Sequence, residues 1–495
     1  MEATNYDVIV VGASNAGGMA ACAAAEKGAK VLLIDKQGSA GYLYRLSIAG
    51  IDTKAQKKAG IKVDKTKLIN FLSAFTQDNI DQRLLWKWAD NSAETVDWLE
   101  DNVLKPHNCH LFAEKDASYE TLINTSFPTE HDVASADGKD VFYGQWVIDK
   151  AVELGVTTKF NTKLEKLITD DSGKVIGIAA GDRRTGAMTE YMARKGVILC
   201  TGGYGSNEDL MKKWDPLALK KNVYSDSPRD DGSGIIAAME IGAAKDEEPA
   251  EIVFNRGAVP VGTNAKEYYI KGFKDVGYFW MGSYPLLKVN LNGERYFNES
   301  EPYEFDTNSS AKQPGYLEAA IWDEDTLDNL AQFHTEGCAR LGWPGFYNTE
   351  ENRDEIASRL KEGFIQKADT IEELADKLDM PKDNLVKSVT RYNQMCAQKK
   401  DTDFGKEAFR LVPVTKGPFY GAILGGRLLA TLDGLRINTN MEVITEEGKA
   451  IPHLYAAGNC SGGFFWGSYP DHVPGLTCSH AQTFGRLAGQ NAAEN

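Results

Sequence analysis

The chain has 495 residues, of which 42% are hydrophobic and 25% are charged, and its formal net charge at pH 7 is −16. This length predicts two or more domains. The acidic balance argues against a nucleic acid or an anionic membrane surface as a partner, because both require clustered Lys and Arg. The chain also lacks an apolar run near the roughly 20 residues that span a bilayer.

The seven cysteines are scattered, without a C-x-x-C pair. This spacing does not match zinc or iron–sulfur ligand sets or a disulfide framework, so we expect no metal. An apolar strand pattern begins within the first ten residues, which leaves no space for a signal peptide. We therefore expect a protein of the reducing cytoplasm.

The first thirty-six residues predict a strand, a glycine turn, a helix and a second strand. The β-branched run at 7–11 leads into Gly12, an alanine-rich segment follows, and a second apolar run at 31–34 ends in Asp35. This is the order of a βαβ unit that binds a dinucleotide. Gly12 allows a tight turn, Gly17 lets the helix pack on the sheet, and Asp35 is placed to accept ribose hydroxyls. The helix N-terminus attracts a pyrophosphate.

One position departs from the dinucleotide-binding pattern, because Ser14 occupies the place of the middle glycine. We expect this small residue to be tolerated, since its hydroxyl can donate a hydrogen bond to a phosphate oxygen. The alternative is a glycine turn in an α/β domain that binds no nucleotide.

Helical spacing of apolar residues continues through 60–104 and again around 146–151. Short strands are predicted after the second helix, at 157–160, 163–169 and 175–180.

Three further segments have the character of the first thirty-six residues. An apolar strand at 196–200 ends in a glycine turn, and Asp231-Gly232 precedes a helix at 235–241. Near the C-terminus, a strand beginning at Leu454 enters another glycine turn, and a helix is predicted from 476 to 493.

The stretch between these regions differs in character and has no glycine fingerprint, so we interpret it as a separate domain. Strands are predicted at Tyr278–Met281 and Leu287–Asn290, and charged helices at Thr370–Leu378 and Asn384–Gln398.

Taken together, the motifs recur in an order that resembles the flavoprotein family of fumarate reductase, succinate dehydrogenase and 3-ketosteroid dehydrogenases. The motifs are the turn at 12–17 with Asp35, and the segments 201–203, 293–299 and 456–459. The resemblance implies an α/β fold with a Rossmann-like FAD-binding domain of the glutathione reductase type and an inserted α+β capping domain. The FAD-binding domain would comprise 1–245 and 406–495, and the cap 246–405. The family interconverts a C–C single and double bond next to a carbonyl or carboxylate.

The resemblance also implies a set of FAD contacts. Members with covalent flavin have a histidine in the loop after the second strand, but 39–50 contains none, so we expect FAD to be bound non-covalently. The helix beginning at Leu476 would direct its positive end towards the flavin. The expected contacts are Gly12, Ser14, Asn15, Ala16, Gly17, Asp35, Lys36, Gly41, Gly50, Thr201, Gly202, Gly203, Asp231, Gly232, Gly458, Asn459, Gly475 and Leu476.

Fumarate reductases hold a dicarboxylate with histidines and arginines, and this chain replaces them. Tyr303 stands where the proton-donating arginine is expected, Ala430 where the substrate histidine falls, and 467–470 replaces the C-terminal arginine. A carboxylate needs a charge-assisted partner to leave water. Reduction of an unsaturated acid is therefore an alternative rather than the expected reaction.

The replacements resemble the ketosteroid dehydrogenases, in which one tyrosine handles the proton and a second tyrosine and a glycine N–H hold the ketone oxygen. Tyr303, Tyr469 and Gly475 match these catalytic roles. The same replacements occur in anaerobic reductases that include tetrahydrodaidzein reductase. We expect C=C reduction, or its reverse, beside a ketone in a neutral cyclic or polycyclic substrate such as a steroid or isoflavonoid. Reductive C–O cleavage of an isoflavonoid, and a flavin protein that only carries electrons, stay open.

Three features remain at this point. The aromatic runs 278–280 and 464–466 suit a flat substrate and core packing equally well, and His472 is expected on the surface of a loop. A second dinucleotide fingerprint is missing, so we expect an external electron donor.

Overall fold

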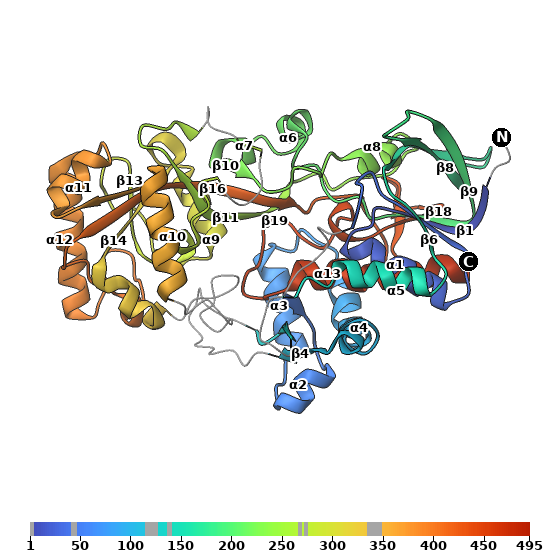
Figure 1. The fold of residues 1–495 in the computed structure, drawn as a ribbon, viewed down its shortest axis with the longest axis horizontal. Coiled ribbons are helices and arrows are strands. Elements are labelled where there is room, and N and C mark those ends of the chain that lie inside the picture. The colour runs from blue at the N-terminus through green and yellow to red at the C-terminus, as the bar shows by residue number, and fades with distance from the viewer. Residues whose placement is uncertain are drawn as a thin grey trace.

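The computed structural model describes residues 4–40, 47–113, 127–135, 141–265, 270–271, 276–333 and 349–495. Figure 1 shows an elongated molecule, with α11 and α12 at one end and both chain termini at the other. Two large sheets form its framework. Among the described residues, none of the helices combines the length and apolarity that crossing a membrane requires.

The first sheet has the order β17-β18-β9-β1-β2-β6, and a hairpin of β7 and β8 continues from β9. β1, β2, β6, β9 and β18 run parallel, as a dinucleotide-binding unit predicts. Its strands are β1 (Thr4–Val11), β2 (Val31–Ile34), β6 (Thr157–Lys159), β7 (Thr162–Thr169), β8 (Val175–Asp182), β9 (Met188–Leu199), β17 (Glu442–Ile444) and β18 (Ala450–Ala456).

Helix α13 (Leu476–Glu494) packs closely on α1 (Asn15–Glu26) beside the first sheet (Figure 1). Glycines on α13 make this possible, since a Cβ on Gly485 would lie 2.3 Å from the carbonyl oxygen of Ala16, and one on Gly489 2.2 Å from that of Ala20. The C-terminal helix is thereby held against the first helix of the chain, and the assignment of the last segment to the nucleotide-binding domain stays a prediction.

Smaller elements surround the first sheet. A three-stranded sheet has the order β3-β5-β4. The predicted helical stretch 60–104 forms two helices and a π-helical turn, and the helix predicted around 146–151 is α5. The bounds are β3 (Ser47–Ala49), β4 (Cys109–Ala113), β5 (Glu130–Ser135), α2 (Lys54–Ala59), α3 (Lys65–Phe75), α4 (Gln82–Leu99), η1 (Glu100–Leu104), η2 (Lys105–His107), α5 (Gly144–Glu153), α6 (Glu208–Trp214), α7 (Ala218–Lys221), α8 (Ser233–Met239) and η9 (Gly458–Cys460).

The second sheet has the order β12-β10-β16-β11-β19, with β13, β14 and β15 attached through β14 and β16. Its strands are β10 (Asn222–Ser225), β11 (Ala250–Val259), β12 (Ile270–Lys271), β13 (Leu287–Asn290), β14 (Glu318–Asp323), β15 (Ile365–Ala368), β16 (Phe419–Thr431) and β19 (Gly467–Ser468). The accompanying helices are η4 (Trp280–Ser283), α9 (Tyr303–Ser310), η5 (Pro314–Tyr316), η6 (Glu324–Phe333), α10 (Thr349–Glu362), α11 (Ile371–Lys377), α12 (Lys382–Gln398) and η8 (Ala408–Arg410).

The second sheet draws strands from several parts of the chain. β10 precedes the predicted cap, whereas β16 and β19 follow it, and β16 pairs with β10, β11, β14 and β15. The boundaries at 245 and 405 stay predictions.

The prediction of a strand at Tyr278–Met281 is wrong. Residues Trp280–Ser283 form the 3₁₀ helix η4, because the Phe279 N–H donates to the Arg256 carbonyl and the chain then turns. The aromatic spacing suggested a strand, but tertiary packing decided the backbone.

Candidate functional site

The glycine turns predicted from the sequence lie at one edge of the first sheet. β1 and β9 end level with each other, with Val11 opposite Leu199, and β18 ends there too, with Ala456 beside the same leucine. Gly12, 201–203 and Gly458 follow directly after these three strand ends. Ligands bind outside the carboxyl ends of parallel strands in open α/β sheets. The fold therefore assembles the predicted nucleotide site from distant segments.

The turn between β1 and α1 leaves no space for side chains at two glycines. Gly12 has φ of +102°, and a Cβ on it would lie 2.3 Å from the carbonyl oxygen of Cys200. A Cβ on Gly17 would lie 1.8 Å from the carbonyl oxygen of Gly12. These close approaches bring the N-terminus of α1 to the sheet edge, where its N–H groups can meet a phosphate.

Ser14 acts as the N-cap of α1. Its hydroxyl donates to the Cys200 carbonyl at 2.8 Å and accepts from the Gly17 N–H at 3.3 Å. The hydroxyl proton is thus held within the protein in this structure, and its donation to a phosphate stays a prediction. Asn15 and Ala16 follow as the first residues of the helix.

Asp35 lies against the turn, as the βαβ pattern predicts. Its carboxylate accepts from the N–H groups of Ala13 at 2.8 Å and Gln37 at 2.7 Å. The next residue, Lys36, places its Nζ 2.9 Å from a carboxylate oxygen of Asp231. Burial would raise the pKa of Asp231, but the Lys36 contact outweighs it and lowers the pKa. Residues 195 positions apart thus meet beside the turn.

The remaining predicted turns join the same edge. The Gly232 N–H donates to the Gly203 carbonyl at 3.0 Å, and a Cβ on Gly202 would lie 2.7 Å from Asp230. A Cβ on Gly458 would lie 3.0 Å from the Cβ of Ala16. Asn459 is part of η9, next to this contact, and Thr201 begins the second turn, while Gly41 lies outside the described residues.

The segment from β3 meets the start of α13. The Ala49 N–H donates to the Gly475 carbonyl at 3.0 Å, and the Gly50 N–H donates to Thr129. The N–H groups of Leu476 and Thr477 both point to the hydroxyl of Tyr469, at 3.1 and 3.4 Å. These two N–H groups stabilise the tyrosine, and the approach of this helix N-terminus to the flavin stays a prediction.

These residues fit FAD. A backbone turn too tight for a side chain, a helix N-terminus and a nearly buried carboxylate meet at the edge where a pyrophosphate and a ribose would lie. Gly475, at the start of α13, packs closely against β3 and extends this edge towards that strand. The residues that would hold the cofactor are those at this edge.

Tyr303, the predicted proton donor, begins α9 directly after Pro302. Its side chain is buried, and its ring lies 4.8 Å from that of Phe254 on β11, measured between centroids. Burial raises the pKa of Asp471, and the backbone N–H of Tyr303 opposes this rise.

Tyr469 follows β19 and is also buried. Its N–H donates to a carboxylate oxygen of Glu304 at 3.1 Å, and its hydroxyl meets the start of α13 next to Gly475. The structure thus brings the elements that carry Tyr303, Tyr469 and Gly475 to one junction between the two sheets. We call the contacts of α9 with residues 469–476 the tyrosine junction.

The sequence analysis missed the charged residues of the tyrosine junction. Glu304 is buried, and burial together with Glu251 raises its pKa to about 8, against the effect of Lys221 at 3.5 Å. Burial raises the pKa of Asp471 to about 7, although the Tyr303 N–H and the charge of Arg410 oppose it. In the sequence, only the position of these acidic residues beside the tyrosines could have indicated their role. Because acidic residues are seldom buried, the sequence offered no reason to place them inside the protein.

The expectation that His472 lies on the surface is wrong. It is 3% exposed, and its ring lies 4.9 Å from that of Phe71 and 5.7 Å from that of Phe75, both on α3. Its Nδ1 lies 3.3 Å from a carboxylate oxygen of Asp471. The loop carrying it turns inward because helix α3 covers it.

Of the two aromatic runs, Phe279, Phe464 and Phe465 are core residues, whereas the other three residues are partly exposed. Phe279 is fully buried and stacks on Trp322 at 5.4 Å. Phe464 and Phe465 pack around the buried imidazole of His480, with centroids 4.4 and 5.3 Å away. Burial in this apolar environment lowers the pKa of His480 to about 3, which keeps the ring neutral.

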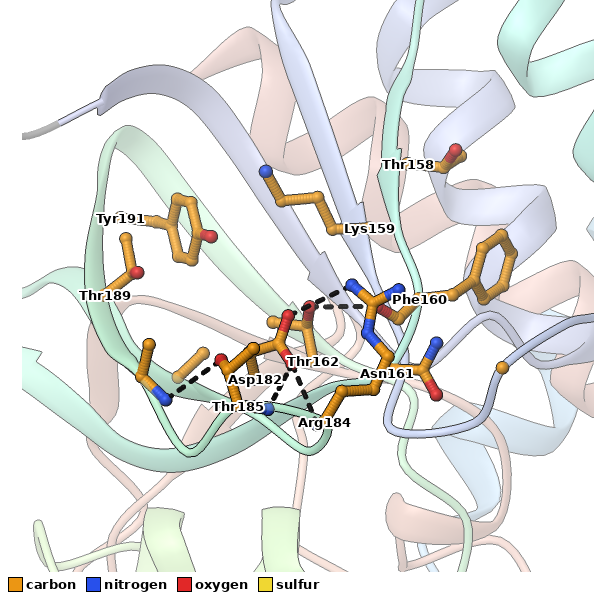
Figure 2. Close-up of a pocket in the computed structure, with 13 residues that line it drawn as sticks. Thr158, Lys159, Phe160, Asn161, Thr162, Asp182, Arg184, Thr185, Thr189 and Tyr191 are labelled. Carbon is orange, nitrogen blue, oxygen red and sulfur yellow. Dashed lines mark hydrogen bonds and ion pairs between the residues drawn. The ribbon is translucent and has the colours of Figure 1, made fainter.

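A polar cavity of about 540 Å³ lies beside the outer strand of the first sheet, as Figure 2 shows. It is bordered by residues of β6 and by the hairpin of β8 and β9, and Arg184 at its rim pairs with Asp182 at 3.1 Å. The lining includes Gly38 and Asn161, near Asp35, but neither proposed catalytic tyrosine. It is therefore separate from the tyrosine junction.

Within the part of the chain that the structure describes, we find no cluster of side chains that could hold a metal ion. The six cysteines described there are buried and not paired in disulfides.

The comparisons with known proteins agree with this geometry. The FAD binding domain family model matches residues 7–472. A vinyl phenol reductase of Lactiplantibacillus plantarum is 28% identical over 99% of this chain and 97% of its own length. A probable fumarate reductase of Shewanella frigidimarina is 28% identical over 99% of this chain and 75% of its own length.

Among solved structures, a 3-ketosteroid Δ1-dehydrogenase of Sterolibacterium denitrificans superposes with a TM-score of 0.75 at 20% identity, covering 99% of this chain and all of that one. This likeness supports the fold. The match of the family model over nearly the whole chain shows that this protein belongs to the FAD binding domain family and is an FAD-dependent oxidoreductase.

Proposed function

We propose that this protein reduces a C=C bond conjugated to an oxygen-bearing ring in a neutral substrate, or catalyses the reverse oxidation. The observation that carries this proposal is the tyrosine junction, where two buried tyrosines and a glycine at a helix start meet next to the FAD-binding edge.

The charges of the junction argue for a neutral substrate. Lys221 already contacts Glu251 at 2.6 Å and Glu304 at 3.5 Å. Arg410 is buried and donates to the carbonyl oxygens of Phe333 at 2.7 Å and Ser300 at 3.4 Å. A substrate carboxylate would need a cation with free donors to replace its water. These two cations are engaged within the protein.

The residues have distinct roles in this proposal. Bound FAD supplies or accepts the hydride. Tyr303 holds the proton that is added to the neighbouring carbon, since a phenol stays protonated at neutral pH. Tyr469 and the Gly475 N–H stabilise the negative charge that develops on the conjugated oxygen, a contribution on the order of 3 kcal/mol per donor. The apolar surroundings of Phe254 and Phe465 exclude water from this step.

The tyrosine pattern favours ring ketones as substrates. The similarity to a vinyl phenol reductase adds alkenes conjugated to a phenol as a second candidate class. In a ring ketone, negative charge develops on the ketone oxygen when hydride is added. In an ionised vinyl phenol, the phenolate oxygen carries the charge, and the side chain takes up its proton before the hydride. The relationship to a probable fumarate reductase makes an unsaturated acid the alternative substrate. We further propose that the electrons come from an external donor, and that FAD is not covalently attached.

The test is an anaerobic half-reaction. The bound flavin is reduced chemically and mixed with a cyclic enone, a ketosteroid, an isoflavonoid, 4-vinylphenol or fumarate, while its visible absorbance is followed. We expect rapid reoxidation by one or more ring compounds, with a saturated product that retains its oxygen. Reoxidation by fumarate alone would overturn the substrate class. Loss of oxygen from the product would establish C–O cleavage instead, and no reoxidation by any member would favour an electron carrier.

A further inference from the structure

The two proposed catalytic tyrosines are connected through the carboxylates beside them. The N–H of Tyr469 donates to Glu304, which follows Tyr303 in the sequence. Burial raises the pKa of Asp471, two residues after Tyr469, and the backbone N–H of Tyr303 opposes this rise. The backbone of each tyrosine therefore interacts with a carboxylate from the other tyrosine's segment.

Both carboxylates are buried at this junction. Glu304 is 1% exposed and Asp471 3%. Glu304 also accepts from the Val253 N–H at 3.4 Å, which connects it to β11. Burying a carboxylate is costly unless hydrogen bonds or charges compensate for the lost water. For Glu304, the N–H groups of Tyr469 and Val253 and the charge of Lys221 at 3.5 Å supply this compensation, so this carboxylate stabilises backbone positions on two different elements.

A second contact supports the same arrangement. Asn308, also on α9, donates to the hydroxyl of Ser468 at 3.0 Å and accepts from Lys221 at 2.7 Å. α9 is thus tied to the segment before α13 at more than one point.

We propose that Glu304 and Asp471 are positioning residues that set the relative placement of Tyr303 and Tyr469, and we call this pair the carboxylate clasp. The inference rests on the proposed function, in which one tyrosine delivers a proton while the other stabilises the oxyanion of the same substrate. The tyrosines come from different elements, α9 beside the second sheet and the loop after β19. The clasp joins these elements directly at the tyrosines.

The clasp predicts that hydrogen-bond acceptance matters more than charge. Asp471→Asn and Glu304→Gln keep a carbonyl oxygen that can accept the tyrosine N–H, whereas Asp471→Ala and Glu304→Ala do not. A displacement of about 1 Å in a reacting group can lower the rate about 100-fold. We expect each alanine variant to lose about that factor in kcat with a small change in KM, and each amide variant to retain most of its activity.

The solvent isotope effect on kcat distinguishes positioning from general destabilisation. Misplacing Tyr303 slows proton delivery, so this isotope effect should rise in the alanine variants and stay at the wild-type value in the amide variants. The matched control is Asp323→Ala, because buried Asp323 also accepts backbone N–H groups, from Thr326, Thr415 and Lys416, but lies on β14 outside the junction. This variant should change stability without raising the isotope effect.

Hydrogen–deuterium exchange on the FAD-loaded protein tests the clasp without any substrate. Peptides covering 299–310 and 463–477 should exchange faster in the alanine variants and at the wild-type rate in the amide variants. If wild-type protein turns over none of the alkenes, the proposed function fails while this measurement still tests the clasp. Unchanged exchange in Asp471→Ala and Glu304→Ala, or amide variants as inactive as the alanine variants, would overturn the clasp.

Discussion

The nucleotide-binding edge and the tyrosine junction are built by opposite means. The edge is formed by backbone, with glycines at Gly12 and Gly17 where any side chain would collide. The junction is formed by buried charged side chains, with Glu304 accepting from the Tyr469 N–H and Asp471 interacting with the Tyr303 N–H from another element. The first region should therefore respond to added atoms, and the second to changes in charge and hydrogen bonding.

This difference reflects what each region binds. A pyrophosphate is recognised by N–H groups and a helix N-terminus, which almost any sequence with the right glycines supplies. A proton donor and an oxyanion site must be placed relative to each other, and this requires contacts between separate elements.

The largest effect is expected from filling the edge. Gly17→Val would place a side chain against the Gly12 carbonyl, 1.8 Å from the position of its Cβ. We expect the loss of bound FAD and a decrease in the free energy of unfolding of more than about 3 kcal/mol. Flavin absorbance of the purified protein and denaturant unfolding measure both. The control is Gly38→Ala, in which the added Cβ would lie 3.4 Å from Asn161, an ordinary van der Waals distance. This variant should keep its flavin.

The next effect should separate the two regions. Tyr303→Phe keeps the ring contact with Phe254 but removes the hydroxyl. We expect kcat to fall by about 10²–10⁴-fold while the flavin content stays the same. Steady-state kinetics with the best alkene and flavin absorbance test this. The control is Tyr420→Phe, on β16 of the second sheet, which loses a hydroxyl that donates a hydrogen bond to Glu324. This variant should stay near wild-type activity. An unchanged rate in Tyr303→Phe would remove this residue from its role.

The pH dependence of stability should single out the tyrosine junction. Burial raises the pKa of Asp471 from 3.8 to about 7. Because the folded state holds this proton more tightly than the unfolded state, the contribution of Asp471 to stability falls as pH rises from about 4 to about 7. Asp471→Asn should therefore gain stability relative to wild type over this range, by up to roughly 1.4 kcal/mol per pH unit. Denaturant unfolding at several pH values measures the difference, and a constant difference would contradict the shift.

The smallest effect concerns the helix cap at the edge. Ser14→Ala removes the hydrogen bonds to Cys200 and Gly17 but adds no atoms. We expect the free energy of unfolding to decrease by about 1 kcal/mol, with FAD still bound. A complete loss of FAD in this variant would show that the serine contacts the cofactor directly.

Much of the fold could be predicted from local pattern. The βαβ unit ending in Asp35, the strand before 201–203 and the final helix are recognisable because apolar periodicity and glycine turns depend on neighbouring residues. The same reasoning failed at Tyr278–Met281, where Phe279 packs on Trp322 and the chain turns into η4.

The proposed site divides in the same way. The candidate tyrosines could be chosen from the residues at motif positions, and their catalytic roles stay predictions. The burial of His472 beneath α3 could not, since nothing adjacent in the sequence indicates that helix.

By itself, the sequence determined the cofactor, the family and the order of the nucleotide-binding elements, because turns and helix starts are encoded within a few residues. Only the tertiary structure decided that Glu304 and Asp471 are buried and that each interacts with the backbone of the other segment's tyrosine. The physical reason is that the cost of burying a charge depends on its partners, and these partners lie more than 160 residues away along the chain.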